Sequence, residues 1–502
     1  MKLRDYQFES ISGARSSLGA GKRKPLIQLP TGGGKTIIAV EIVKGALSKG
    51  NRVLFLAPRR ELIYQAHQKF VDNGIDCGIV MAGESMRYAK VQVASFDTVN
   101  ARYMRRGNDL PPADLVIVDE AHLSVAPTRL KILNWYADSG AIIIGLTATP
   151  ARGDGKGLGA FYDDLISGWS IKRLTKSGYL SPVKYYAHTP PDLSGLKTGA
   201  HGDYVEKQVA GVMDKGELIG DIVKNWKRIA FGKSTVIFCS SQKHSRHVRD
   251  QFNSAGILAE HIDANTPDDE RREILERMAS GETTVLCNVY VASYGLDIPR
   301  LECAVLARPT KSLVLYLQTV GRVLRPSEGK ENAIVIDHAG VLTEHGFIDS
   351  VIPWALNDES SIKDRKKDIQ RERAEPKEIT CGDCGSVFVS RRDCPTCGYE
   401  MIPPTEAIPT YAADLVEIHA IESKAWNRKT DWPSKIQFFG ELKGYASRKQ
   451  YSAGWCAHQY RSRTGVWPND SRLKGVQPIA PSPDLLGWIK YQAIKRNAAV
   501  AA

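Results

Sequence analysis

A glycine-rich loop after a short apolar run is the feature that most constrains the fold of this chain. The run PLIQL, residues 25–29, is followed by Thr31, Gly32, Gly33, Gly34, Lys35 and Thr36. Glycines let successive backbone N–H groups approach phosphate oxygens, a lysine adds compact positive charge, and a threonine hydroxyl can bind Mg²⁺. The loop predicts a nucleotide-binding corner in an α/β sheet, although Leu29 replaces the glycine with which such loops usually begin.

An acidic pair follows a second apolar run about eighty positions later. Asp119 and Glu120 stand directly after LVIV, residues 115–118. One carboxylate in this place can hold Mg²⁺, and a second can orient or deprotonate the attacking water. We assign the first role to Asp119 and the second to Glu120. The loop and the pair together favour a protein that hydrolyses ATP.

The size and charge of the chain limit its class. With 502 residues, of which 42% are hydrophobic, the chain can form about three or four domains. A net charge of +12 and a pI near 9.1 favour nucleic acid over a membrane as partner. No run reaches the roughly eighteen apolar residues of a membrane span, and the start MKLRDYQFES lacks the apolar core of a signal peptide. We therefore expect a cytoplasmic protein.

Short apolar runs alternate with helical stretches in two parts of the chain. In residues 1–175 the runs are PLIQL, VLFLA, VQVAS, LVIVDE and AIIIGLTAT, with helical segments such as 36–48 and 61–73 between them. In residues 181–350 the runs are STVIFCS, AEHIDA, TTVLCNV, CAVLAR and NAIVIDH. Strands separated by helices predict an α/β fold with two parallel sheets covered on both faces. The second part has no phosphate loop, so we expect it to complete a site that it shares with the first.

Four cysteines follow a charged stretch, residues 360–378, that is predicted to be a solvated helix or linker. They lie in residues 379–400, in CGDC and CPTC, and are Cys381, Cys384, Cys394 and Cys397. This spacing, in a chain expected to stay in a reducing compartment, predicts a zinc ribbon with a tetrahedral Cys₄ site. The ribbon would staple a small domain, and whether it also contacts nucleic acid is left open.

Residues 411–502 form a basic tail in which aromatic and positive side chains interleave. Lys449, Arg461 and Arg463 suit phosphate neutralisation beside bases stacked on the aromatic rings. A small helical domain whose core is built from these rings is an equally good interpretation. Its core residues would be Trp455, Tyr460 and Trp467. The two interpretations are compatible.

Six short motifs occur in order along residues 1–350. They are LRDYQ from residue 3, LAPRREL from 56, ASFDTV from 94, TATP from 147, SYGLDIP from 293 and QTVGRVLRP from 318. Together with the loop and the acidic pair, this order resembles the superfamily 2 helicases, which have two tandem RecA-like P-loop domains and tolerate the departure at Leu29.

The resemblance implies roles for further residues. Arg4 and Gln7 would recognise adenine, and the threonines of TATP would link the ATP site to the bound strand. Gln318, Arg322 and Arg325 would lie on one helix, enter the cleft between the domains and stabilise charge on the transferring phosphoryl group. Gly295 and Asp297 would contact the nucleotide. The residues expected to contact nucleic acid are Arg59, Arg60, Ser95, Thr98 and Ser293.

The resemblance favours an ATP-dependent DNA helicase or translocase that uses ATP, Mg²⁺ and Zn²⁺. The segment 149–168 and the KGY…GW…WP tail resemble the RadD group and bacteriophage helicases, which implies forked or branched DNA as substrate and replication or recombination proteins as partners. Alternatives are a duplex-DNA translocase subunit of a restriction or defence complex, and an RNA helicase. A non-enzymatic scaffold is disfavoured because the candidate catalytic residues are all present.

Overall fold

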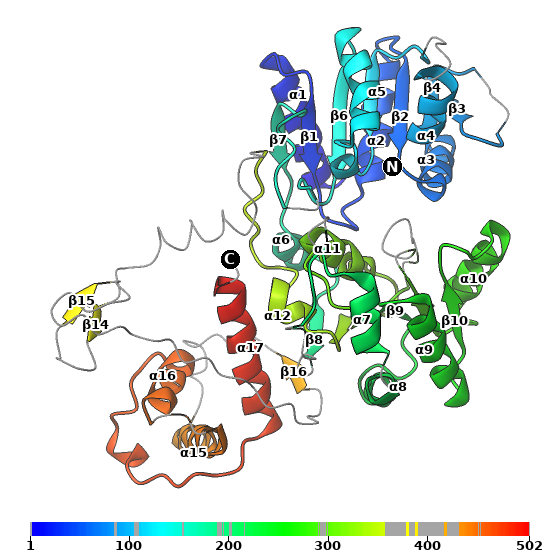
Figure 1. The fold of residues 1–502 in the computed structure, drawn as a ribbon. Helices are drawn as coiled ribbons and strands as arrows, with labels where there is room; N and C mark the ends of the chain where they lie inside the picture. The colour runs from blue at the N-terminus through cyan, green and yellow to red at the C-terminus, as the bar shows by residue number, and fades with distance from the viewer. Residues whose placement is uncertain are drawn as a thin grey trace.

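Two α/β domains and a smaller helical unit follow one another along the chain (Figure 1). The computed structural model describes residues 3–84, 88–104, 110–152, 155–187, 193, 195–199, 203–214, 216–289, 291, 298, 300–356, 378–380, 387–389, 416–418, 431–449, 451 and 453–500.

The first domain holds a parallel sheet of seven strands. They are β1 Pro25–Gln28, β2 Val53–Ala57, β3 Cys77–Val80, β4 Val91–Ser95, β5 Leu115–Val118, β6 Ile142–Thr147 and β7 Asp164–Ser167. Their order across the sheet is β3-β4-β2-β5-β6-β1-β7, and every neighbouring pair is parallel. The carboxyl ends of all seven strands therefore lie at one edge, where α/β folds bind ligands.

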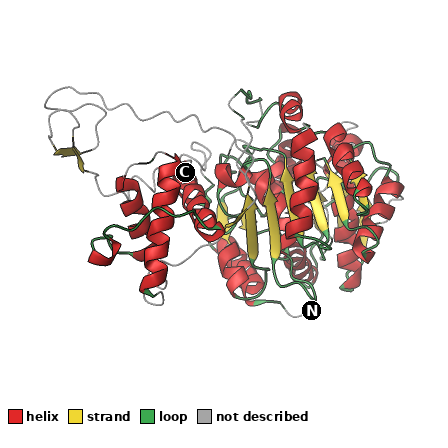
Figure 2. Cartoon of the chain, turned by 90° about the horizontal axis from the view of Figure 1, so that it is seen from below, coloured by secondary structure: helices red, strands yellow, loops and turns green. Residues whose placement is uncertain are grey.

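Figure 2 shows helices on both sides of the strands in the α/β part of the chain, and the helices of the first domain belong to these layers. They are α1 Asp5–Gly19, α2 Lys35–Leu47, α3 Arg60–Asp72, α4 Phe96–Val99, α5 Pro127–Asp138 and α6 Ile171–Lys176. Strands β1, β2 and β5 are buried along their whole length because both of their faces are covered.

The second domain has its own seven-stranded sheet. Its strands are β8 Val183–Ala187, β9 Thr235–Cys239, β10 Ala259–Ile262, β11 Val285–Asn288, β12 Cys303–Ala307, β13 Ala333–Asp337 and β16 Val416–Ile418, in the order β10-β11-β9-β12-β13-β8-β16. All pairs are parallel except β16 with β8. Its helices are α7 Glu206–Met213, α8 Gly216–Ile229, α9 Gln242–Ser254, α10 Asp268–Ser280, α11 Leu313–Gly321 and α12 Val341–His345. The predicted fold class, with two parallel sheets in tandem, is confirmed.

The C-terminal unit packs three helices around one small core. The helices are α15 Trp432–Lys449, α16 Ala453–Thr464 and α17 Pro483–Val500. Phe438, Leu442, Tyr460 and Trp488 are buried between them. A short hairpin precedes this unit, in which β14 Glu378–Thr380 pairs antiparallel with β15 Val387–Val389.

The C-terminal unit is joined to the second sheet. Strand β16 extends that sheet beyond β8, and α17 packs against β16 and α12. The Lys490 ammonium donates to the carbonyl of Ala187, and the ring of Tyr491 stacks on Phe347 with 5.2 Å between centroids. A region that the sequence marks as a separate tail thus supplies an edge strand to the second domain.

A strap of chain returns from the second domain to the first. Residues 346–356 leave α12 and run back toward β7 (Figure 1). At the end of the strap, the carbonyl of Leu356 accepts a hydrogen bond from the backbone N–H of Gly159 at 2.7 Å. The two domains are therefore connected twice, once through residues 177–182 and once through this strap.

Candidate active site

The phosphate loop leaves the carboxyl end of β1 and leads directly into α2. Gly34 has φ 79° and caps the helix, which begins at Lys35. A Cβ on Gly33 would lie 2.9 Å from the carbonyl oxygen of Pro30, to which the Gly33 N–H donates at 2.9 Å. Only glycine fits these two positions, and the free N–H groups of a helix N-terminus favour a phosphate here. Lys35 and Thr36 are half-buried beside this cradle.

Gln7 lies against the phosphate loop, and Arg4 lies beside Gln7 at the start of α1. Gln7 is buried, its amide Nε2 donates to the carbonyl of Gly33 at 3.4 Å, and its Oε1 accepts the N–H of Arg4 at 3.0 Å. The guanidinium of Arg4 lies 4.9 Å from the ring centre of Tyr179. Tyr179, which no motif singles out, therefore fixes the arginine that was expected to stack on adenine.

The acidic pair lies at the carboxyl end of β5, one strand away from β6 and two from the phosphate loop. The Asp119 carboxylate accepts the N–H of Glu120 at 2.9 Å. Glu120 has φ 46° and ψ 51°, a left-handed conformation that costs a non-glycine residue about 1 kcal/mol. Backbone strain at a site of this kind is held in place by the surrounding structure.

Burial and neighbouring charges separate the two carboxyls. Burial, followed by the charge of Glu120, raises the pKa of Asp119. Burial also opposes ionisation of Glu120, but the positive charges of Lys35 and Arg322 outweigh it and lower the pKa of this carboxyl. Two carboxylates in one dry site cannot both ionise easily, and a cation between them and Lys35 would relieve this. The Oε2 atom of Glu120 is buried and lies 3.5 Å from Nδ1 of His122, but it makes no hydrogen bond within the described part of the chain, which suits a group that orients water.

His122 joins the two domains. Its Nδ1 lies 3.0 Å from the hydroxyl of Thr147 at the end of β6, and its Nε2 lies 3.3 Å from the amide Nε2 of Gln318 on α11. An amide nitrogen only donates, so the imidazole Nε2 accepts and the proton is on Nδ1. Burial lowers the pKa of His122, which keeps the ring neutral in this role. Thr147 in turn bonds the backbone of Thr149.

The two motif arginines approach the first domain from α11 and the turn after it. Helix α11 ends at Gly321, and a 3₁₀ turn begins at Arg322. Arg325 follows this turn and has an extended backbone. The expectation that Gln318, Arg322 and Arg325 share one helix is therefore wrong, because the helix stops between the first and the second of them. Arg322 is buried, and its charge helps to lower the pKa of Glu120 and opposes the rise in the pKa of Asp119.

Arg325 and Gly321 touch the phosphate loop itself. A Cβ on Gly32 would lie 3.3 Å from Cγ of Arg325, and a Cβ on Gly321 would lie 2.5 Å from Cβ of Thr31. A cavity of about 310 Å³ continues from Thr31 between α11 and the strap. Residues of the first and the second domain therefore line one site.

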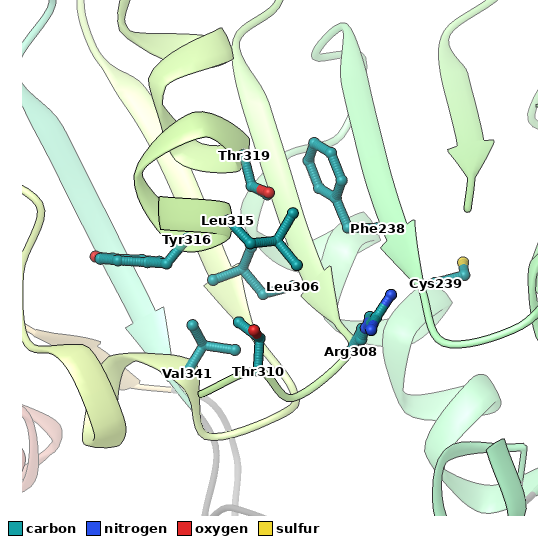
Figure 3. Close-up of a pocket in the computed structure, with 9 residues that line it drawn as sticks. All are labelled: Phe238, Cys239, Leu306, Arg308, Thr310, Leu315, Tyr316, Thr319 and Val341. Carbon is teal, nitrogen blue, oxygen red and sulfur yellow. The ribbon is translucent and has the colours of Figure 1, made fainter. Parts of the chain in front are cut away.

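The second domain leaves little room of its own beneath α11. Figure 3 shows residues that line a cavity there, among them Leu306, Leu315 and Thr319. The volume of this cavity is about 20 Å³, which is space for about one water. The volume is too small for a nucleotide.

The predicted nucleic-acid contacts of the first domain divide into two groups. Arg59 and Arg60 stand at the start of α3, and Arg60 lies 3.9 Å from Asp268 of the second domain. Ser95 and Thr98 are buried, and their hydroxyls accept backbone N–H groups of Thr98 and Ala82. They shape the start of α4, and their contact with nucleic acid stays a prediction.

Several predicted site residues lie outside the described residues. They are Ser293, Gly295, Asp297, Cys381, Cys384, Cys394 and Cys397. Within the described part of the chain, no group of three or more His, Cys, Asp or Glu side chains could hold a metal ion. Nor does any described helix combine the length and apolar character needed to cross a membrane.

Of the three nucleic-acid contacts predicted in the C-terminal unit, one is wrong. Lys449 is exposed at the end of α15, and Arg461 is exposed with its guanidinium 4.5 Å from the ring centre of Trp467. Arg463 is buried instead, with its guanidinium over the rings of Phe438 and Trp488. It is part of the core and cannot reach a phosphate. Of the three aromatic residues expected in the core, Tyr460 is buried, Trp455 is partly buried, and Trp467 is exposed.

These features define a P-loop ATPase with two RecA-like domains. Residues 1–152 match the family described as type III restriction enzyme, res subunit, and residues 214–327 match the helicase conserved C-terminal domain. The chain belongs to the superfamily 2 helicases and is an ATP-hydrolysing enzyme.

Named relatives agree with this assignment. The 51.5 kDa protein of Lactococcus phage (isolate 7-9) is 34% identical over 376 residues, which are 75% of this chain and 78% of the phage protein. The ATP-dependent helicase IRC3 of Saccharomyces cerevisiae is 30% identical over 67% of this chain but only 51% of its own length, so the chain spans about half of the yeast protein. A solved fragment described as the HsdR subunit of a type I restriction enzyme from Vibrio vulnificus YJ016 has a TM-score of 0.54 at 24% identity. The match covers 68% of this chain and 65% of the fragment, and it shows that the two share a fold.

Proposed function

We propose that this chain is an ATP-driven motor that unwinds or remodels forked or branched DNA. The observation that carries the proposal is that one site is lined from both domains. Gln318 contacts His122 across the cleft, and Arg322 and Arg325 lie beside the acidic pair and the phosphate loop. A ligand held from both sides favours the closed arrangement of the domains, and its loss removes that preference.

The residues of the site have complementary roles in hydrolysis. The glycine cradle and Lys35 would bind the β- and γ-phosphates, while Thr36 and Asp119 would hold Mg²⁺, which neutralises phosphate charge. Glu120, with its buried and unbonded Oε2, would orient the attacking water and accept its proton. Arg322 and Arg325 would stabilise charge that develops on the transferring group.

Closure of the cleft has a direct structural basis in the described residues. Arg271 of α10 donates to Glu61 of α3 at 2.9 Å, and the imidazole of His122 bonds Gln318. Since Glu61 lies next to Arg59 and Arg60, the predicted strand-contacting surface is tied to the second domain at the same time as the ATP site. Opening and closing would therefore move that surface with each cycle.

DNA is favoured over RNA because the matching family and the similar solved fragment are both described as parts of restriction enzymes, which act on DNA. Stimulation of ATP hydrolysis by single-stranded DNA, forked DNA, a four-way junction, duplex DNA and RNA tests this choice. We expect the forked or branched DNAs to stimulate most. A chain stimulated only by RNA would contradict the proposal.

The same comparisons favour a second candidate, a translocase that moves along duplex DNA for a partner nuclease. It predicts that the chain displaces a third strand from a triplex without separating the duplex. Unwinding of a forked duplex by the chain alone decides for the first candidate, and triplex displacement without unwinding decides for the second.

We also propose that the four cysteines hold one zinc ion. The hairpin β14–β15 pairs on either side of the first cysteine pair in the sequence, which is where a zinc knuckle would be supported. Metal analysis of the purified chain should give about one zinc per chain, and Cys394→Ser should lower it. Cys77→Ser, which changes a buried cysteine of β3, should leave the zinc content unchanged. Zinc-free, folded wild-type protein would contradict this.

A further inference from the structure

Lys330 makes an unusually complete set of hydrogen bonds just behind residues 322–325, which we call the arginine segment. Its ammonium donates to the carbonyls of Val323 and Arg325 at 2.7 Å each and to the carbonyl of Leu301 at 2.6 Å. A protonated lysine has three N–H donors, so every one of them is used on a backbone carbonyl. Two of the three acceptors lie within residues 322–325.

A tight turn brings Lys330 back under this segment. Gly329 has φ 75°, and the N–H of Lys330 donates to the carbonyl of Ser327 at 3.1 Å. The ammonium is largely buried, and burial lowers the pKa of Lys330 to about 8, with Glu302 and Arg325 as the neighbouring charges. Burying a charged ammonium is costly unless its hydrogen bonds are made, so the geometry is specific.

The remaining carbonyl of the segment is held from another direction. Leu324 accepts the N–H of Ser181 at 2.8 Å, and the Ser181 hydroxyl donates to the carbonyl of Arg325 at 3.4 Å. All carbonyls from Val323 to Arg325 therefore have donors from other parts of the protein, although residues 322–325 lie beyond the end of α11, in a 3₁₀ turn and the extended residue after it. The backbone from which Arg325 extends toward Gly32 is fixed by these contacts.

We propose that Lys330 is a positioning residue for ATP hydrolysis: it holds the backbone of residues 323–325 so that Arg325 stays against the phosphate loop. This inference rests on the proposed function, because it assumes that Arg325 acts on the phosphoryl group. Lys330 itself does not touch the nucleotide. Its loss should therefore lower kcat while leaving the KM for ATP nearly unchanged.

A double-mutant cycle tests the inference in the full chain. Lys330→Met keeps the length of the side chain and removes its donors, and single-turnover hydrolysis at saturating ATP and DNA should slow by about 10- to 100-fold. Lys233→Met is the matched control, because Lys233 pairs with Glu302 at 2.8 Å on the same domain but does not contact the arginine segment. The control should keep the wild-type rate. If Lys330 acts through Arg325, then Lys330→Met should slow an Arg325→Ala chain little further.

The outcomes separate this inference from the proposed function. If Arg325→Ala slows hydrolysis and Lys330→Met does not, the inference about Lys330 is wrong and the proposed function stands. An equal slowing by Lys330→Met in both backgrounds shows a general structural role and also overturns the inference. A wild-type rate in Arg325→Ala contradicts the assumed role of the arginine itself. Should Lys330→Met melt below the assay temperature, Lys330→Gln, which keeps two N–H donors without charge, takes its place in the cycle.

Discussion

Two arginines of this chain are buried to nearly the same extent but in different parts of the molecule. Arg322 is 6% exposed and Arg463 is 5% exposed. Arg322 lies in the cleft between the two sheets, where its charge acts on Asp119 and Glu120. Arg463 lies inside the C-terminal unit, where its guanidinium faces the rings of Phe438 and Trp488 at 4.7 and 5.4 Å from their centres, and the carboxylates of Asp484 and Glu441 are its neighbouring charges.

The difference shows that burial alone does not identify a functional arginine. A buried guanidinium must be compensated, and carboxylates and aromatic faces both do this. The carboxylates near Arg322 belong to the candidate ATP site, where a ligand can use their field. The rings and carboxylates near Arg463 belong to the C-terminal helices and contribute to packing of a core. We therefore expect substitution of Arg322 to affect hydrolysis and substitution of Arg463 to affect folding of the C-terminal unit.

Arg322→Ala should have the largest effect on activity. Loss of a charge that stabilises the transferring phosphoryl group slows hydrolysis by about 10³-fold or more. The thermal melting temperature should change little, since the cleft loses one side chain and no core. Single-turnover hydrolysis and a thermal melt of the same preparation measure both quantities. If the Arg322→Ala chain unfolds more readily but each folded molecule hydrolyses ATP at the wild-type rate, then Arg322 has a structural role and the contrast with Arg463 is wrong.

Glu120→Gln should also slow hydrolysis strongly, by about 10²- to 10³-fold, while ATP still binds. The amide keeps the shape of the side chain but cannot accept a proton from water. Glu41→Gln on α2 is the control, because Glu41 is partly exposed and pairs with Lys44 at 3.4 Å, one turn further along the same helix. Equal rates of ATP hydrolysis in the Glu120 variant and this control would contradict the catalytic role of Glu120.

Arg463→Ala should destabilise the C-terminal unit by about 2–4 kcal/mol, the usual cost of truncating a large buried side chain. ATP hydrolysis without DNA should keep its wild-type rate. Hydrogen exchange in α15–α17 reports the local loss of stability. Arg461→Ala, two residues earlier on the same helix and exposed, should leave exchange nearly unchanged. Similar exchange in both variants would mean that the burial of Arg463 has no energetic role.

Neutralising Lys449 and Arg461 together should have the smallest effect. If these exposed charges contact phosphates, Lys449→Gln with Arg461→Gln lowers the slope of log affinity against log salt by about 1 to 2 and weakens binding to all DNA sequences alike. Titration of forked DNA at several salt concentrations measures the slope. If the salt dependence of DNA binding is unchanged, these two charges do not contact phosphates, and the role of the C-terminal unit is to pack on the second domain.

Local pattern was sufficient for the elements that build the ATP site. Strands β1, β2 and β5 begin at the predicted residues because each is an apolar run closed by a loop, and Gln7, Gly33 and Lys35 come together as the motif order implies. Tertiary contacts decide the rest. Tyr179 under Arg4 and Lys330 under Arg325 depend on segments far from the motifs, and a single sequence carries no signal for such contacts.

The C-terminal unit was predicted less well for a physical reason. Basic and aromatic residues that interleave in the sequence suit a surface that binds DNA and a core stacked around arginine equally well. Only the position of each residue on α16 separates the two, since Arg461 faces solvent and Arg463 faces Trp488. Strand β16, with three residues, was too short to be seen as part of the second sheet.

The central claim is that one chain builds its ATP site from both of its own sheets, and mixing two inactive variants tests it most directly. Lys35→Ala removes the lysine of the first domain, and Arg325→Ala removes an arginine of the second. In the presence of DNA, each variant alone should hydrolyse ATP at about 1% of the wild-type rate or less. An equimolar mixture should be as inactive as its components, because every chain still lacks one half of its own site. A wild-type rate in Arg325→Ala alone, or a clear recovery of hydrolysis in the mixture, would contradict the account.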